Sequence, residues 1–149
     1  MPEAAELRAA VSIGLDLAVE LIGAARRRAE QIGVAVSIAV VDGGGHLVAF
    51  ARMDGAEIAG PTLAVDKAFT AVAHRVATSE LGALAAPGGS LFGLHANGGG
   101  RYVLFAGGVP LAIDGVVLGG VGVSGADAAD DESCAYAASA AFAEAGSAR

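Results

Sequence analysis

The sequence predicts an α+β domain in which a five-stranded, mainly antiparallel sheet is flanked by helices. Two turn signals indicate hairpins, because Gly43–Gly45 and Asp114-Gly115 each stand between apolar runs. Segments with helical periodicity come before, between and after these hairpins. A chain of 149 residues can bury a core of its own, so we expect residues 1–149 to form one domain.

The first third of the chain predicts a helix and two strands. Apolar residues recur at steps of three and four from about Glu3 to Ile32, and Gly33 follows as a helix stop. Val34–Val41 is apolar on both faces apart from Ser37, which is typical of a central strand that is covered on both sides. His46–Arg52 alternates in polarity and returns as the second strand.

The middle of the chain predicts two helices and a long loop. Pro61 suits the first turn of a helix that runs to about Val76. A shorter helix follows and ends near Ala85, with Thr78 as its expected N-cap. The stretch 87–100 holds six glycines and one proline. Loops of this length in compact domains are usually functional or mobile.

The last third of the chain predicts three strands and a helix. The strands are expected over Tyr102–Phe105, Val109–Ile113 and Val116–Val123. Gly119, Gly120 and Gly122 suit a central strand against which another backbone packs closely. The final helix is expected to begin at Asp127, whose side chain can cap it, and to stop at Gly146.

The composition excludes some partners and favours others. Sixteen acidic residues against nine basic ones give a formal net charge of −7, which argues against nucleic-acid and membrane surfaces. The apolar fraction of 54% predicts a homo-oligomer, because a subunit interface would bury part of the apolar surface of each chain. The N-terminus lacks the pattern of a signal peptide, so we expect a cytoplasmic protein. Cys134 is interpreted as a small buried residue on a helix.

Lys67 is the only lysine of the chain, and it lies inside an otherwise apolar helix. Its spacing places it on one helical face with His74 and Thr78. A partly buried lysine can act as a base or a nucleophile, or can bind a carboxylate. The structural alternative is a snorkelling side chain, or an ion pair with Asp66 or Asp54.

The histidines and acids do not predict a site for a bare metal ion. His46, His74 and His95 lack metal-binding spacing, so a zinc site would need distant segments. Any one of them could be the axial ligand of haem iron, because one histidine is enough. Glu3 and Glu6 are interpreted as acids in a first helical turn. Phosphate-loop and Ser-His-Asp signatures are absent from the sequence.

Four segments match the motifs of a known family: VVDGGGHLVAFARMDGA (40–56), DKA (66–68), FAGGVPL (105–111) and GGVGVSG (119–125). The chain thereby resembles the GlcG/HbpS-like family, the haem-binding or "haem-degrading" domain that also ends PduO-type proteins. The resemblance implies a profilin-like or PAS-like domain that assembles into dimers or larger oligomers, including octamers. It also implies a ligand pocket near a subunit interface, at positions that match Asp42, His46, Arg52, Asp54, Lys67, Gly107, Gly108 and Pro110.

Two functions of different kinds are expected from these residues, and a purely structural role in an assembly is the third alternative. The first is a soluble oligomeric binding protein for haem or a related tetrapyrrole, with Phe105 among the apolar walls and a histidine as axial donor. The second is a cofactor-independent enzyme for a small carboxylate or carbonyl substrate. In that enzyme Lys67 or Asp54 is the catalytic base, Arg52 clamps the carboxylate, and the Gly107-Gly108 amides stabilise an oxyanion. Haem is the one cofactor that we expect.

Overall fold

The structure is a computed structural model in which residues 11–147 are described. Its helices and strands, in chain order, are α1 (Leu15–Ile32), β1 (Ser37–Asp42), β2 (Leu47–Arg52), α2 (Gly60–His74), α3 (Thr78–Ala85), η2 (Leu94–Ala96), η3 (Gly98–Gly100), β3 (Gly108–Ile113), β4 (Val116–Ser124) and α4 (Ala128–Ser147). The strands form one antiparallel sheet in the order β2-β1-β4-β3. The α+β class is confirmed, but the described sheet has four strands and not five.

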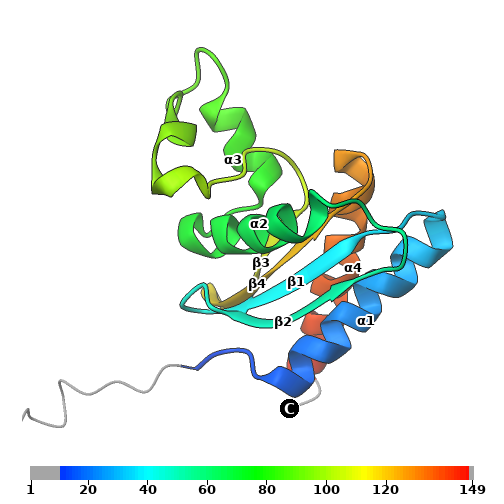
Figure 1. The fold of residues 1–149 in the computed structure, drawn as a ribbon. Helices are drawn as coiled ribbons and strands as arrows, with labels where there is room; N and C mark the ends of the chain where they lie inside the picture. Colours follow the sequence, from blue (N-terminus) through cyan, green and yellow to red (C-terminus); the bar gives the residue numbers. More distant parts are fainter. Residues whose placement is uncertain (1–10, 148–149) are drawn as a thin grey trace, which may run out of the picture.

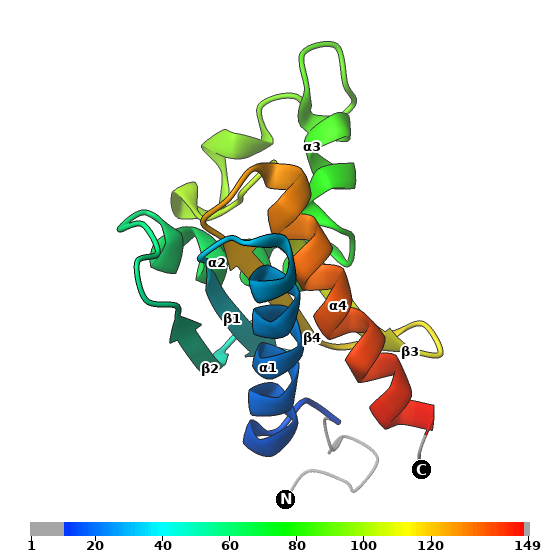
Figure 2. The same cartoon turned by 90° about the vertical axis from the view of Figure 1, so that its right-hand side faces the viewer.

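Helices cover both faces of the sheet and make three layers. Helix α2 packs on one face, while α1 and α4 lie side by side on the other (Figure 1, Figure 2). The main core lies on the α1/α4 side and includes Leu21, Ile38, Leu111, Val121 and Phe142. Among residues 11–147, no helix is long and apolar enough to cross a membrane.

Both predicted hairpins are present, and their turns have the expected backbone. Asp114 and Gly115 both have positive φ, 51° and 78°, as a type I′ turn between β3 and β4 requires. The glycines of β4 also behave as predicted. A Cβ atom on Gly122 would overlap the Ala64 carbonyl of α2, so this bare strand lets the helix backbone approach closely.

The predicted strand Tyr102–Phe105 is wrong, because this segment is held by side chains instead of a ladder. The Val103 N–H donates to Thr70 Oγ1 at 3.0 Å, and the Thr70 hydroxyl contacts the Arg101 carbonyl. The Tyr102 ring meets the edge of the His74 ring, with the centroids 4.4 Å apart. Packing against α2 therefore outweighs the β propensity of these residues.

Several predicted helix ends are also displaced by tertiary contacts. The structure starts α1 at Leu15, because Ile13 N–H donates to the Leu118 carbonyl of β4 at 3.1 Å. The part of the prediction at 3–10, including Glu3 and Glu6, lies outside the described residues. Thr78 does not cap α3, whose N-cap is Ala77, and its hydroxyl instead accepts the Gly108 N–H at 2.9 Å.

The last helix begins at Ala128, directly after Asp127, and it extends through Ser147, so the predicted stop at Gly146 is wrong. Asp127 precedes α4, and its carbonyl accepts the Asp131 N–H at 2.9 Å. The side-chain bond at this helix end comes from Asp131, whose Oδ1 accepts the Ala126 N–H at 2.9 Å. Cys134 is buried on this helix, as the sequence predicts. Burial raises the pKa of its thiol to about 11, and nearby Asp131 adds to the shift.

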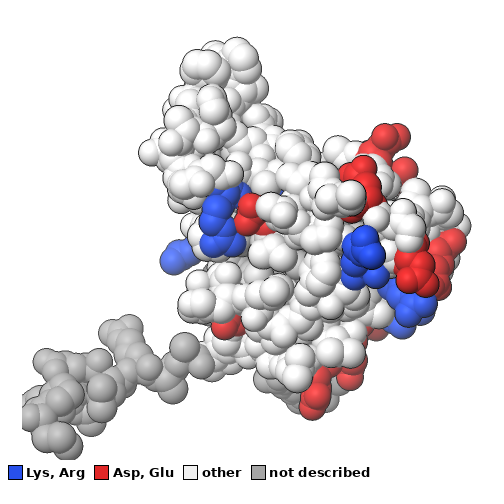
Figure 3. All heavy atoms as spheres, in the orientation of Figure 1, with Lys and Arg blue, Asp and Glu red and all other residues white. Residues whose placement is uncertain are grey.

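A projecting arm, residues 78–100, extends beyond the three layers at the top of Figure 1. It consists of α3 and the glycine-rich loop with its two short 3-10 helices. From residue 81 to residue 100 the sequence contains no Asp, Glu, Lys or Arg. In Figure 3 this arm is accordingly white, whereas charged side chains gather on the body.

Candidate functional site

The predicted site residues lie in three separate places. Lys67, Phe105, Gly107 and Gly108 lie together where β3 begins and β4 ends, and Pro110 follows in β3. The other two places are the β1–β2 turn, with Asp42 and His46, and the end of β2, with Arg52 and Asp54. Within one chain the eight family positions therefore do not line a single pocket, and the expected pocket near a subunit interface stays a prediction.

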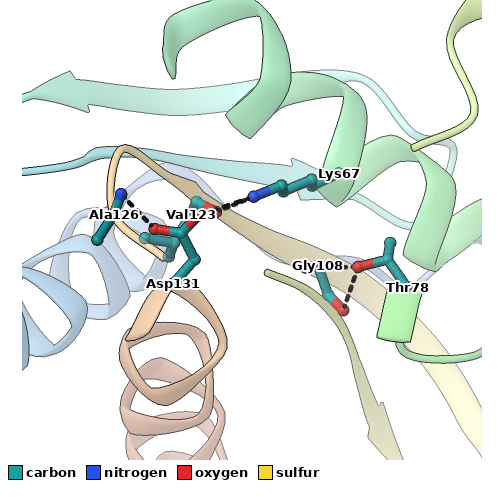
Figure 4. Close-up of polar contacts among 6 residues, drawn as sticks. All are labelled: Lys67, Thr78, Gly108, Val123, Ala126 and Asp131. Carbon is teal, nitrogen blue, oxygen red and sulfur yellow. Dashed lines mark hydrogen bonds and ion pairs between the residues drawn. The ribbon is translucent and has the colours of Figure 1, made fainter. Parts of the chain in front are cut away.

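Lys67 is fully buried and joins the two helical layers across the sheet. Its Nζ donates to the Val123 carbonyl at 2.9 Å and to Asp131 Oδ2 at 3.0 Å (Figure 4). The predicted structural pairing with Asp66 or Asp54 is wrong, since Asp66 instead accepts Arg101 Nε at 3.0 Å. Lys67 comes from α2 and Asp131 from the first turn of α4, so the pair ties α2 to β4 and α4.

Burial changes the proton affinity of both partners. It lowers the pKa of Lys67, and the hydrogen bond and charge of Asp131 oppose this change. Burial likewise raises the pKa of Asp131, against the Ala126 N–H and Lys67. Because each group supports the charged form of the other at 3.0 Å, we treat them as an ion pair. Neither side chain is open to a ligand in this conformation.

Two glycines and one aromatic ring complete the surroundings of Lys67. The Phe105 ring centroid lies 5.0 Å from Nζ, while 49% of Phe105 remains exposed. A Cβ atom on Gly107, at a φ of 131°, would lie 2.7 Å from Nζ. The Gly108 N–H is already donated to Thr78 Oγ1, so this amide is not available as an oxyanion donor (Figure 4).

Sequence reasoning did not predict the contacts of Thr78 and Asp131 in this cluster. Thr78 was expected to cap a helix and to share a helical face with Lys67, and Asp131 was not expected as the partner of Lys67. A usable signal existed for Asp131, because a lysine buried in an apolar helix needs a buried acid as its partner. The sequence does not say which acid that is.

The β1–β2 turn presents His46 to solvent beside Asp42. Asp42 Oδ1 accepts the N–H groups of Gly44 at 2.9 Å and His46 at 3.0 Å. The same oxygen lies 3.3 Å from Nδ1 of His46, whose side chain is 81% exposed. Burial alone would raise the pKa of Asp42, but these hydrogen bonds and the charge of His46 outweigh it and lower this pKa.

Two adjoining hollows surround this turn. The first has a volume of about 670 Å³, and its lining residues include Val11, Ser12, Asp42, His46 and Val116. The second has a volume of about 390 Å³, and its lining residues include Phe69, Val72, Arg75 and Gly115. They share Gly43, Gly44, Val116 and Val117 as lining residues. Both volumes fall within the range of small-molecule sites.

Comparison with known proteins shows the family of this chain. A family model described as "Haem degrading protein HbpS-like" matches residues 13–140. The chain belongs to the HbpS-like family. It is 37% identical over 133 residues to a 15.0 kDa protein of the dhaT-dhaS intergenic region of Citrobacter freundii, covering 89% of this chain and 94% of that protein. The resemblance seen in the sequence motifs is thereby confirmed.

Two solved structures share the fold of this HbpS-like chain. Klebsiella pneumoniae protein ORFY is 33% identical with a TM-score of 0.89, and the match covers 93% of this chain and 95% of that one. The PduOC:heme complex is 38% identical with a TM-score of 0.84, and the match covers 88% of this chain and 95% of that one. The second of these proteins has been crystallised with haem.

The other histidines of the HbpS-like chain are in less suitable positions for ligation. His74 is half-buried, with Nδ1 3.2 Å from the Thr70 carbonyl and its ring against Tyr102. His95 lies in the projecting arm, with its ring 6.4 Å from that of Phe92. Within residues 11–147, no three His, Cys, Asp or Glu side chains lie close enough together to hold a metal ion. His46 is therefore the strongest candidate for a ligand nitrogen.

Proposed function

We propose that this HbpS-like protein binds haem, or a related flat tetrapyrrole, in the hollow at the β1–β2 turn, with His46 as the axial ligand. The observation that carries the proposal is the contact between Asp42 Oδ1 and His46 Nδ1 at 3.3 Å. A carboxylate on one ring nitrogen fixes the tautomer and leaves the other nitrogen as a donor to a metal. His46 Nε2 has no hydrogen-bond partner among the described residues.

The residues around His46 fit the other needs of a haem. Val11 and Val116 line the hollow and remain 69% and 59% exposed, so an apolar ligand would cover surface that now faces water. Arg75 lines the adjoining hollow and could pair with a propionate. When bound, haem would supply an iron that takes an imidazole nitrogen as its axial ligand. The haem complex of the relative PduOC, at 38% identity, supports the same ligand class.

A hemin titration with matched histidine variants tests this proposal. Wild type should show a saturable Soret shift at one hemin per chain. His46→Ala should lose that shift or move its maximum, whereas His95→Ala, which changes a histidine in the arm, should behave as wild type. Asp42→Asn should weaken binding, because the His46 tautomer is then no longer fixed. Equal binding by wild type and His46→Ala would refute this ligand assignment.

We also propose that the projecting arm is the contact between copies in a homo-oligomer. Leu84, Leu91 and Phe92 are exposed on this arm, and no charged side chain accompanies them from residue 81 to residue 100. Copies that each carry a net charge of −7 repel one another, so a contact between them is favoured where charge is absent. The exposed apolar side chains would supply the energy of association.

The mass of the assembly in solution tests the arm proposal. Wild type should elute with a mass that is a multiple of 14.4 kDa in light scattering. Leu91→Ser combined with Phe92→Ser should give a smaller assembly. The control is Ile58→Ser, since Ile58 is the most exposed large apolar residue outside the arm within residues 11–147. A variant assembly of unchanged mass would remove the arm from the interface.

A second candidate function, a cofactor-independent enzyme that uses Lys67, depends on Phe105. This half-exposed ring lies over Nζ, at 5.0 Å from its centroid. Its rotation would uncover an amine whose pKa is already lowered by burial. Borohydride trapping with small aldehydes, followed by peptide mass spectrometry, should then modify Lys67, and Phe105→Ala should increase the yield. If no Lys67 adduct forms in either protein, the amine is not used in this way.

A further inference from the structure

A third hollow lies at the opposite end of β2 from His46. It has a volume of about 360 Å³ between α1 and the end of this edge strand. Ile38, Ala51 and Met53 form its apolar part, and the charged side chains that line it are Arg26, Arg52 and Asp54. Five strand steps of about 3.3 Å separate Leu47 from Arg52, so this hollow is about 17 Å from the start of β2 and distinct from the proposed haem site.

The charged groups of this hollow have unused hydrogen-bonding capacity. Arg26 pairs with Glu30 through Nε at 3.0 Å, which leaves its two terminal nitrogens without a partner among the described residues. The side chains of Arg52 and Asp54 have no hydrogen bond or ion pair within residues 11–147, although the two residues are only two positions apart. Opposite charges that border one apolar floor and do not pair with each other remain available to a ligand.

The combination of groups selects a chemical class. Two guanidinium groups offer several N–H donors in fixed forks, which match the two oxygens of a carboxylate. A carboxylate on the protein, here Asp54, would repel a simple anion but would accept a hydrogen bond from an ammonium or hydroxyl group. The half-buried side chains of Ala51 and Met53, with Ile38 beneath them, suit an aliphatic chain.

We propose that this hollow binds a small aliphatic carboxylate that also carries a hydrogen-bond donor, such as an apolar amino acid. Arg26 and Arg52 hold the ligand carboxylate, Asp54 accepts the donor, and the floor packs against the aliphatic part. The net charge of −7 disfavours anions over most of this surface. Figure 3 shows basic side chains next to acidic ones at the right of the body, where α1 and β2 end. An anionic group therefore needs a local pair of cations, here Arg26 and Arg52, to bind to this acidic protein.

Calorimetric titration with three related probes tests this proposal. L-leucine carries the carboxylate, the ammonium and an aliphatic chain, 4-methylpentanoate lacks the ammonium, and 3-methylbutylamine lacks the carboxylate. L-leucine should bind saturably and most tightly, 4-methylpentanoate more weakly, and the amine not at all. No saturable binding of L-leucine up to about 10 mM would overturn the proposal, because that concentration exceeds the range of a specific small-molecule site.

Matched variants assign the site. Arg52→Gln and Arg26→Gln should each weaken L-leucine binding by about tenfold, the effect of one charge-assisted hydrogen bond. The control is Arg27→Gln, which removes the same charge from the next residue of α1 but does not line this hollow. Asp54→Asn should weaken L-leucine and leave 4-methylpentanoate unchanged or tighter. An equal loss in Arg27→Gln and Arg52→Gln would show a general charge effect and overturn the assignment.

Discussion

Replacement of Asp131 by Asn tests how the buried ion pair stabilises the fold. The substitution keeps the shape of the side chain but removes its charge, so the fully buried Lys67 ammonium has only neutral acceptors. These are the Val123 carbonyl at 2.9 Å and the single amide oxygen of the new side chain, for which the Ala126 N–H competes. Removal of one partner of a buried pair typically costs about 3–5 kcal/mol. In a domain of this size, about 4 kcal/mol corresponds to a fall in Tm of about 12 °C. Thermal and urea unfolding followed by circular dichroism would measure both values.

Two further variants separate the pair from its surroundings. Asp127→Asn removes an exposed acid just before the same helix and should change the free energy of unfolding by less than about 0.5 kcal/mol. Lys67→Met combined with Asp131→Asn removes the unpaired buried charge and should restore most of the lost stability. A loss below about 1 kcal/mol in Asp131→Asn, or a double variant no more stable than the single one, would refute the buried-charge argument.

Three other predictions concern Lys67, Gly122 and Cys134. Lys67→Met removes the cation that opposes the raised pKa of Asp131. Because the pKa of Asp131 is raised in the folded state, its protonated form favours folding at low pH, and this contribution is lost as the pH rises. The free energy of unfolding of Lys67→Met, measured from pH 4 to pH 8, should therefore be lowest relative to wild type near neutrality and should approach the wild-type value in acid. Gly122→Ala should cost about 3 kcal/mol by denaturant unfolding, whereas Gly14→Ala, with open space around it, should be nearly neutral. Cys134, with a thiol pKa of about 11, should not react with a disulfide reagent at pH 8 until the protein unfolds.

The features that the sequence predicted correctly are local ones. The Asp114-Gly115 turn is determined by the backbone preferences of two adjacent residues, and it has the predicted positive φ at both. The glycines of β4 imply a close neighbour wherever the strand lies, and α2 is that neighbour at Gly122. The Asp42–His46 contact is also local, but it was not predicted. The motif VVDGGGH placed both residues among the expected ligand positions through the family resemblance, and that assignment stays a prediction.

The features that sequence reasoning did not predict depend on contacts between distant segments. The Tyr102–Phe105 segment has strand-like residues, but Thr70 takes its Val103 N–H from 33 positions away. Lys67 meets Asp131 across 64 positions, and nothing near either residue distinguishes that acid from Asp66 or Asp54. The family resemblance implied one pocket near a subunit interface, and that pocket stays a prediction. Within one chain the strand order keeps the three groups of residues apart.

The sheet explains why these places can serve different purposes. Strand β2 is an edge strand that has few contacts with α2. His46 lies just before the start of this strand, and Arg52 lies at its end. The Lys67–Asp131 pair lies instead at the buried junction of α2, β4 and α4, where loss of one charge leaves the other unpaired. Substitutions at the ends of β2 should therefore change ligand binding with little effect on stability. Substitutions at the junction should change stability first, and any effect they have on ligands should scale with the fraction of folded protein.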